Sequence, residues 1–220
     1  MWLSILVFAS LVFLTSLGVV SSRVSCAQVK QEELESLLDR MQHYHYPTSD
    51  QAAEQLLKLA KSDPEARKFL VARMPAVIER ANAQSTVAMR VFENEVRLVG
   101  DLQIVEASRA LADKVDRYTS TIASGGFENR EAIHALVEIG EPAVPAVIEV
   151  LQHGKADQRK YSAVVLGFIG SRAGEAALRE ALARETDAEV RDYIEKALDP
   201  PDSWTLSGVP KDKTRPRRHE

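Results

Sequence analysis

The chain repeats itself at a nearly constant interval, and this feature constrains its fold more than any other. Gln158–Leu166 aligns with Val190–Leu198 at an offset of 32 residues, which places arginine on arginine, tyrosine on tyrosine and leucine on leucine. Leu136–Gly140 aligns with Leu166–Gly170 at an offset of 30, and Arg97–Asp101 is a weaker copy about 38 residues earlier. A period of about 20 to 50 residues is typical of arrays in which each unit stacks on the next.

Each copy has the pattern of a helix that ends in a Val-Gly or Ile-Gly turn and is followed by a second helix. Apolar residues fall at helical spacing beyond Gln28, and no run alternates as a half-buried strand does. Gly140 and Gly170 stand where a first helix ends, because glycine adopts the left-handed backbone there without steric cost. Asp187 is the predicted N-cap of the last helix. The predicted fold class is therefore all-α, an α-solenoid of stacked antiparallel helix pairs forming an armadillo-type superhelix.

Two stretches resemble HEAT repeats, and specifically the short bacterial form called the phycobilin-lyase (PBS lyase) HEAT-like repeat. The first is HALVEIGEPAVPAVIEVL at residues 134–151, and the second is Asp187–Arg191, which opens a first helix. The resemblance implies a HEAT-like array over residues 50–198, with about four units and a terminal half-unit from Asp187 to Leu198. It also implies that Arg159 and Arg191 form a buried polar ladder between units.

Residues 1–27 are predicted to be a signal peptide or an N-terminal membrane anchor. Positions 2–22 carry no charged side chain, and the small residues Ser25 and Ala27 precede polar Gln28, as signal peptidase requires. Cleavage after Ala27 is the preferred interpretation. The apolar run of about 21 residues is also long enough to span a bilayer, and no Lys or Arg precedes it. We expect export to the bacterial periplasm or the extracellular space, or alternatively tethering to the membrane by the uncleaved helix.

The segments that flank the array have different predicted roles. Residues 28–49 are predicted to form an N-terminal capping helix and turn, since the terminal unit of an array needs a polar outer face. Thr48–Asp50 is expected to supply the N-cap of the following helix. Residues 199–220 are predicted to be a Pro-rich, basic and disordered tail, with a net charge of +3 over its last ten residues. Its alternative role is contact with a membrane surface or cell-wall polymer, and Trp204 is expected to fold back onto the last helix.

No combination of residues in the sequence predicts a reaction. The motifs of serine hydrolases, zinc proteases and phosphate-binding loops are not present. His43 and His45 are the only close histidine pair, and no third metal ligand is evident near them. Cleavage after Ala27 would remove Cys26, the only cysteine. We therefore predict no catalytic residue, no cofactor and no metal.

Charge and architecture together favour a protein partner. Without Arg23 the chain carries 27 basic and 32 acidic residues, a net charge of −5, so nucleic acid is not an expected partner. The predicted function is a non-enzymatic protein-binding or scaffold module whose groove holds a protein or peptide. Helical phase on the second helices selects the partner-binding residues Arg109, Lys114, Glu149, Gln152, Arg179 and Arg184. The alternatives are a bilin-lyase-like enzyme, which the family resemblance implies, and a purely architectural envelope protein.

Overall fold

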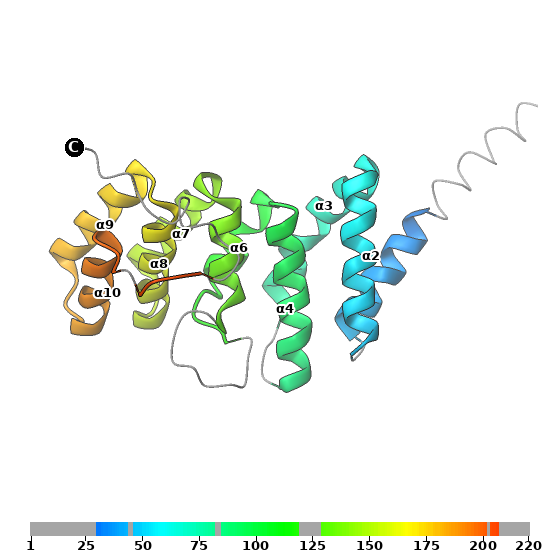
Figure 1. Cartoon of the computed structure of the whole chain (residues 1–220), viewed down its shortest axis with the longest axis horizontal. Helices are drawn as coiled ribbons and strands as arrows, with labels where there is room; N and C mark the ends of the chain where they lie inside the picture. The colour runs from blue at the N-terminus through cyan, green and yellow to red at the C-terminus, as the bar shows by residue number, and fades with distance from the viewer. Residues whose placement is uncertain (1–29, 44–45, 82–84, 119–128, 202, 207–220) are drawn as a thin grey trace, which may run out of the picture.

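The computed structural model describes residues 30–43, 46–81, 85–118, 129–201 and 203–206 of the chain. Within these ranges every regular element is a helix (Figure 1), so the prediction of an all-α fold is confirmed. Residues 30–43 are helical. The α-helices that follow are α2 (Thr48–Ser62), α3 (Pro64–Arg80), α4 (Thr86–Asp101), α5 (Ser108–Ala112), α6 (Glu131–Ile139), α7 (Val144–His153), α8 (Ala156–Ile169), α9 (Arg172–Arg184) and α10 (Ala188–Leu198). Short 3₁₀ helices, Val105–Ala107 and Glu141–Ala143, lead into α5 and α7.

The helices form two layers. In the first, which we call the A layer, α2, α4, α6, α8 and α10 pack one against the next. In the second, the B layer, α3, α5, α7 and α9 do the same. The layers also pack on each other, since α3 contacts α2 and α4, α5 contacts α6, and α8 contacts α7 and α9. The helices stack side by side along the long axis of the molecule (Figure 1). The fold is therefore an α-solenoid of stacked antiparallel helix pairs, held together by contacts between neighbouring units.

One hydrophobic core runs through the whole array. It begins at Leu34 in the first helical segment, passes through fully buried side chains such as Phe92 and Leu136, and ends at Leu206. Each helix contributes the apolar stripe that its sequence spacing predicts. Because no unit has a core of its own, each unit depends on its neighbours for burial.

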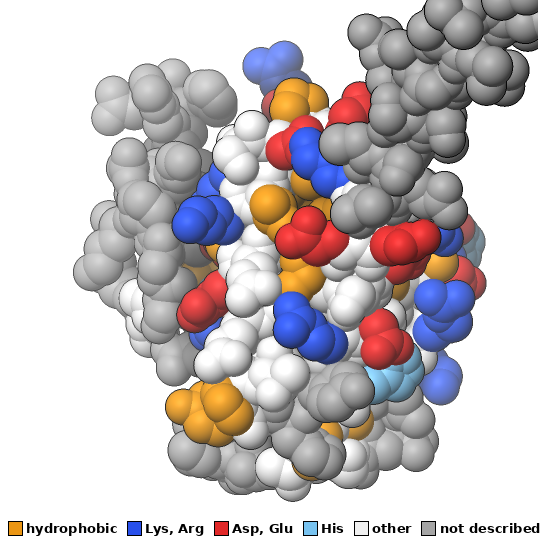
Figure 2. Space-filling view, turned by 90° about the vertical axis from the view of Figure 1, so that its right-hand side faces the viewer, with side chains coloured by type: hydrophobic (Ala, Val, Ile, Leu, Met, Phe, Trp, Pro, Cys, Tyr) orange, Lys and Arg blue, Asp and Glu red, His pale blue; other side chains and the backbone are white. Residues whose placement is uncertain are grey.

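The helical segment 30–43 closes the N-terminal end of the array. Leu34, Leu37, Leu38 and Met41 are buried, whereas the side chains at residues 30–33 are exposed. Figure 2 views this end and shows charged side chains spread among small, separate hydrophobic areas. The described part of this end that is visible in Figure 2 therefore has no continuous apolar face on which another unit would stack.

The start of α2 differs from the sequence prediction. Thr48–Asp50 was expected to cap this helix, but α2 already begins at Thr48, and no side chain caps it. Ser49 is buried instead, and its Oγ donates a hydrogen bond to the carbonyl of Met41 at 2.7 Å. The serine thus fixes the first helical segment to α2, which a capping pattern in the sequence does not reveal.

The glycines of the repeat have two different roles. Gly140 and Gly170 have positive φ angles of 75° and 62° at the ends of α6 and α8, as predicted. Gly100 is different, because α4 continues through it to Asp101 and the left-handed residue is Gln103, with φ of 49°. A Cβ at Gly100 would lie 3.0 Å from the Cα of Ala135. Gly100 therefore allows α4 to approach α6 closely, and the predicted Val-Gly turn at this position is wrong.

Gly167 offers a test of how tightly neighbouring units pack. It lies within α8, where a Cβ would come within 2.9 Å of the carbonyl oxygen and 3.0 Å of the Cα of Ala197 in α10. Alanine gains about 1 kcal/mol of helix propensity over glycine, but pressing on backbone atoms costs about 1 to 3 kcal/mol. We expect Gly167→Ala to lower the free energy of unfolding by up to about 2 kcal/mol in urea titrations followed by circular dichroism.

Gly174→Ala is the matched control. The three atoms nearest to its new Cβ all belong to side chains: Ser171 Oγ at 3.1 Å, and Cδ2 and Cβ of Leu166 at 3.4 and 3.6 Å. This change is expected to be close to neutral. A Gly167→Ala variant that is more stable than the wild type would contradict the close packing of α8 on α10.

The C-terminal segment returns over the A layer. Residues 203–206, which we call the strap, cross α8 in an extended path (Figure 1). The Trp204 ring lies 6.0 Å from the ring of Phe168 and 5.9 Å from that of Tyr193, and Leu206 is buried. The prediction that Trp204 folds back onto the last helix is confirmed. The strap belongs to the tail that the sequence predicts to be disordered, and the basic residues 207–220 of this tail lie outside the described residues.

The predicted signal or anchor, residues 1–27, also lies outside the described ranges. Among the helices that the structure does describe, none combines the length and the apolar character that a membrane span requires.

Candidate interaction surface

The B layer carries five of the six predicted partner-binding residues on exposed positions. Arg109 belongs to α5, Glu149 and Gln152 to α7, and Arg179 and Arg184 to α9. Since α5 packs on α7 and α7 on α9, these side chains come from three successive units. We call them the B-face residues.

Arg109 and Glu149 are the two B-face residues that the structure joins. The Arg109 guanidinium forms an ion pair with the Glu149 carboxylate across the boundary between α5 and α7, and a second one with Asp113 at 3.1 Å. Arg109 thereby lowers the pKa of the Glu149 carboxyl. All three side chains are about half exposed, so this charged network lies at the surface.

The other arginines of the B face pair within their own helix. Arg179 contacts Glu175 at 2.7 Å and Arg184 contacts Glu180 at 3.2 Å, each one turn earlier in α9. Exposed pairs of this kind contribute less than about 1 kcal/mol, so their guanidinium groups exchange partners at little cost.

Lys114 is not exposed, in contrast to the prediction. It is 8% exposed, and its Nζ donates to the carbonyl of Ala81, after the end of α3, at 3.1 Å. Burial lowers the pKa of its ammonium group. The helical phase fails here because α5 ends at Ala112, so residue 114 no longer follows the spacing of the helix.

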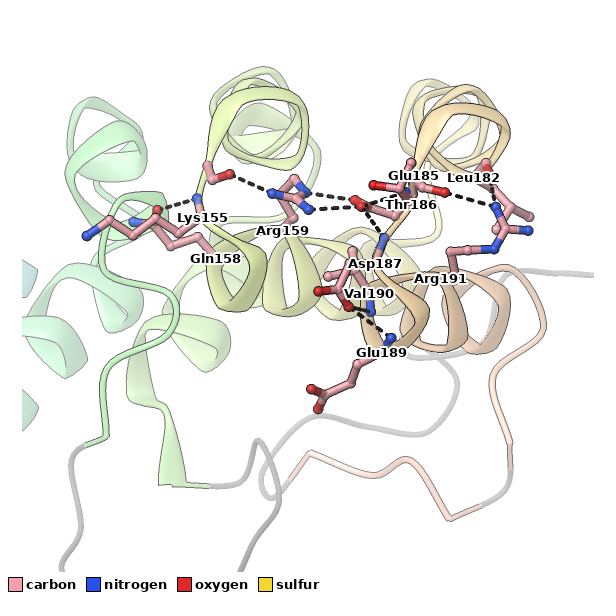
Figure 3. Close-up of polar contacts among 11 residues, drawn as sticks. Lys155, Gln158, Arg159, Leu182, Glu185, Thr186, Asp187, Glu189, Val190 and Arg191 are labelled. Carbon is pink, nitrogen blue, oxygen red and sulfur yellow. Dashed lines mark hydrogen bonds and ion pairs between the residues drawn. The ribbon is translucent and has the colours of Figure 1, made fainter.

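A polar network holds the turn between α9 and α10 (Figure 3). Glu185 accepts hydrogen bonds from Nε and NH2 of Arg159, at 2.7 and 2.9 Å, and from the backbone N–H groups of Thr186 and Asp187. Arg159 lies in α8 and also donates to the carbonyl of Gly154 in the turn before α8. Arg159 therefore links the turn before α8 to the turn before α10.

Arg191 contacts the same turn from the other side. Its NH1 donates to the carbonyls of Leu182 and Glu185, at 2.8 and 3.1 Å (Figure 3). Asp187 caps α10 by accepting from the N–H groups of Glu189 and Val190, as the sequence predicts. The polar ladder that the resemblance implied for Arg159 and Arg191 is present, although both side chains are only partly buried.

The carboxylate of Glu95 is the least expected polar group in the structure. Glu95 lies in α4 and is 3% exposed. Its Oε1 accepts a 3.5 Å hydrogen bond from Gln42, and its Oε2 has no hydrogen-bond partner among the described residues. Burial raises the pKa of this carboxyl from its ordinary value of 4.5 to about 7.

This pKa predicts that stability falls as the pH rises. The folded chain holds the Glu95 proton up to about pH 7, whereas the unfolded chain loses it near pH 4.5. The stabilisation of the folded chain by this bound proton is complete below pH 4.5 and is lost as the pH rises through 7. Glu95→Gln should therefore raise the free energy of unfolding at pH 8 by about 1 to 2 kcal/mol, and change it little at pH 4.5. Urea titrations at both pH values test this, and an equal effect at both would contradict it.

The structure gives no reason to assign a metal centre to the described part of the chain. No group of three His, Cys, Asp or Glu side chains there is arranged to hold an ion. His43 lies 2.9 Å from the carboxylate of Asp39 on the same helical segment, and His45 is outside the described residues.

Comparison with known proteins finds one similarity, to a repeat family. A family model described as HEAT repeats matches residues 128–199. No curated protein and no solved structure matches the chain. The matched residues include all of α6 to α10, with the stacked pairs, the glycine turns and the Arg159–Glu185–Arg191 network. This part of the solenoid, α6 to α10, is therefore similar to HEAT repeats.

Proposed function

We propose that the chain is a non-enzymatic scaffold that binds a protein or peptide on the exposed face of its B layer. The observation that supports this proposal is the ion pair from Arg109 to Glu149, which extends one charged surface across two units. Stacked helical repeats provide extended surfaces for such binding. The partner would approach α5, α7 and α9 together.

The chemistry of this face favours a polar, charged partner. Each B-face arginine already contacts a carboxylate, and each of these contacts is exposed to solvent. An acidic side chain of the partner can replace the internal carboxylate at little net cost, since exposed ion pairs contribute less than about 1 kcal/mol. Several such exchanges along three helices give recognition that depends on the spacing of the partner's charges.

A combined variant tests the proposal. Alanine at Arg109, Glu149, Gln152, Arg179 and Arg184 removes the B-face side chains without touching the core. Cross-linking in cells, followed by mass spectrometry, should show a selective partner whose recovery falls at least about tenfold with this variant. The matched control replaces exposed Glu54 and Lys58 of α2 by alanine and should leave recovery unchanged. Equal recovery with both variants would refute the B face, and the absence of any selective partner would favour an architectural role.

We also propose that the protein is exported, with residues 1–27 as its signal or anchor. The mass of the protein isolated from its host compartment tests this directly. Cleavage after Ala27 should give a chain that begins at Gln28. The full mass, together with recovery in the membrane fraction, would instead support the anchored form.

The bilin-lyase alternative depends on the finer family resemblance alone. It predicts that the purified protein binds or transfers a bilin, which a visible absorbance spectrum of a mixture with free bilin would detect. An unchanged spectrum would exclude it.

A further inference from the structure

In an array of two layers, no further layer of helices packs on the outer side of an A-layer helix. The outer side of α8 is nevertheless covered. Nine consecutive residues of α8, from Lys160 to Phe168, are buried. By contrast, the residues buried in α10 are confined to Val190, Ile194 and Ala197. Part of the cover over α8 is the strap, because the Trp204 ring packs against Phe168 of this helix.

The strap lies on α8 and α10 in the manner of a bound extended peptide. Ser203 and Thr205 are exposed, whereas Trp204 is half-buried and Leu206 is buried. This alternation has the period of two residues that an extended chain shows when one side faces a surface. The surface thus receives an aromatic side chain and, two residues later, an aliphatic one.

The surface that contacts the aromatic side chain is formed by helices of two units. Phe168 of α8 and Tyr193 of α10 contact the Trp204 ring, at centroid distances of 6.0 and 5.9 Å. Tyr161 of α8 packs edge-on against Tyr193 at 6.2 Å and holds that ring in position. The ammonium group of Lys196 lies 5.7 Å from the Tyr193 centroid, so a cation lies beside this aromatic contact surface. We call this surface of α8 and α10 the A-face surface.

We propose that the A-face surface is a second binding site, which accepts an extended segment of a partner protein. This segment has an aromatic residue and a leucine-like residue two positions apart, and the strap is the intramolecular occupant of the site. The site lies on the opposite layer from the B face and does not depend on binding there. Its partner must displace the strap, whose tether through Pro200 and Pro201 gives it a high effective concentration. A partner segment therefore binds only if its affinity is high enough to compete with the tethered strap.

Tryptophan fluorescence makes displacement directly visible. The chain has two tryptophans, at positions 2 and 204, so the full chain with Trp2→Phe reports on the strap alone. The probe is a synthetic peptide of residues 200–209 in which phenylalanine replaces tryptophan. We expect this peptide to shift the Trp204 emission to longer wavelength in a saturable manner, because the displaced ring enters water. The same peptide with alanine at both apolar positions should give no shift.

A weakened strap provides the complementary experiment. In the full chain with Trp204→Ala and Leu206→Ala, a fluorescein-labelled wild-type peptide of residues 200–209 should bind at least about tenfold more tightly than to the wild-type chain. Adding Tyr193→Ala should abolish this gain. Circular dichroism verifies that the variants are folded, and the emission experiment stands without them.

Two outcomes would overturn the proposal. If the Trp204 emission does not change up to millimolar peptide while the chain stays folded, the strap is a permanent cap of the array. If the chain forms dimers that exchange their straps and the peptide does not bind, the A-face surface binds a second copy of the chain.

Discussion

Leu166→Ala is expected to lower the free energy of unfolding by about 2 to 5 kcal/mol, and by more than Leu198→Ala. Leu166 is 1% exposed in α8, which packs on α6, α7, α9 and α10. Truncation there leaves a cavity that several neighbouring helices border. Leu198 is the last residue of α10 and is only partly buried, so water fills part of the space that its side chain leaves.

Urea titrations followed by circular dichroism measure both losses. In an array held by contacts between neighbours, the loss depends on the position of the unit, since a central helix contributes to more interfaces than a terminal one. Equal losses at the two leucines would show that the chain unfolds as a single block whose ends and centre matter equally.

Glu185→Gln should lower the free energy of unfolding at pH 7 by about 2 to 3 kcal/mol. The hydrogen bonds from Arg159, with those from the backbone of the turn, lower the pKa of the Glu185 carboxyl from 4.5 to about 2. A shift of this size corresponds to about 3 kcal/mol of preference for the charged form in the folded chain. Glutamine keeps the shape but loses the charge and one of the two acceptor oxygens.

The same pKa predicts how the chain responds to acid. The stabilisation by Glu185 is present above pH 4.5, where the carboxyl is charged in both the folded and the unfolded chain, and it is lost as the pH falls through about 2. The difference between the wild type and Glu185→Gln should therefore shrink between pH 4.5 and pH 2.

Glu180→Gln is the matched control for this experiment. Glu180 also pairs with an arginine, but its side chain and that of Arg184 are each 61% exposed. Its loss should cost less than about 1 kcal/mol at any pH. Urea midpoints at pH 7, 4.5 and 3 compare the two variants. If both cost the same at pH 7, the Arg159–Glu185 network does not join the units energetically.

The features that were predictable from the sequence are those that local chemistry requires in every unit. Gly140 and Gly170 end their helices because a left-handed backbone favours glycine, and Asp187 caps α10 because its carboxylate reaches free N–H groups nearby. Trp204 was expected on the last helix because it is a large apolar side chain just beyond it. The glycine turns and the cap do not depend on a distant part of the chain.

The wrong predictions have one common cause, which is that contacts between units decide the positions of these residues. Gly100 has the sequence of a turn residue but serves the approach of α4 to α6. Lys114 was placed on an exposed face by helical phase, yet the early end of α5 buries it. The importance of Glu185 and the burial of Glu95 left no signal in the sequence, since isolated glutamates on a helical surface are ordinary. Only the position of the neighbouring unit gives each of them its role.

The sequence by itself determined that the chain is an array of helix pairs, because helical periodicity, glycine turns and caps recur at a nearly fixed interval. Only the tertiary structure decided which faces the array presents. It joined Arg109 to Glu149, fixed Glu185 between two arginines, buried Glu95 and laid the strap across α8. The physical reason is the separation along the chain of the groups that interact. A turn or a cap is stabilised within a few residues of chain, whereas burial and ion pairing between units depend on the angle and distance at which one helix pair stacks on the next.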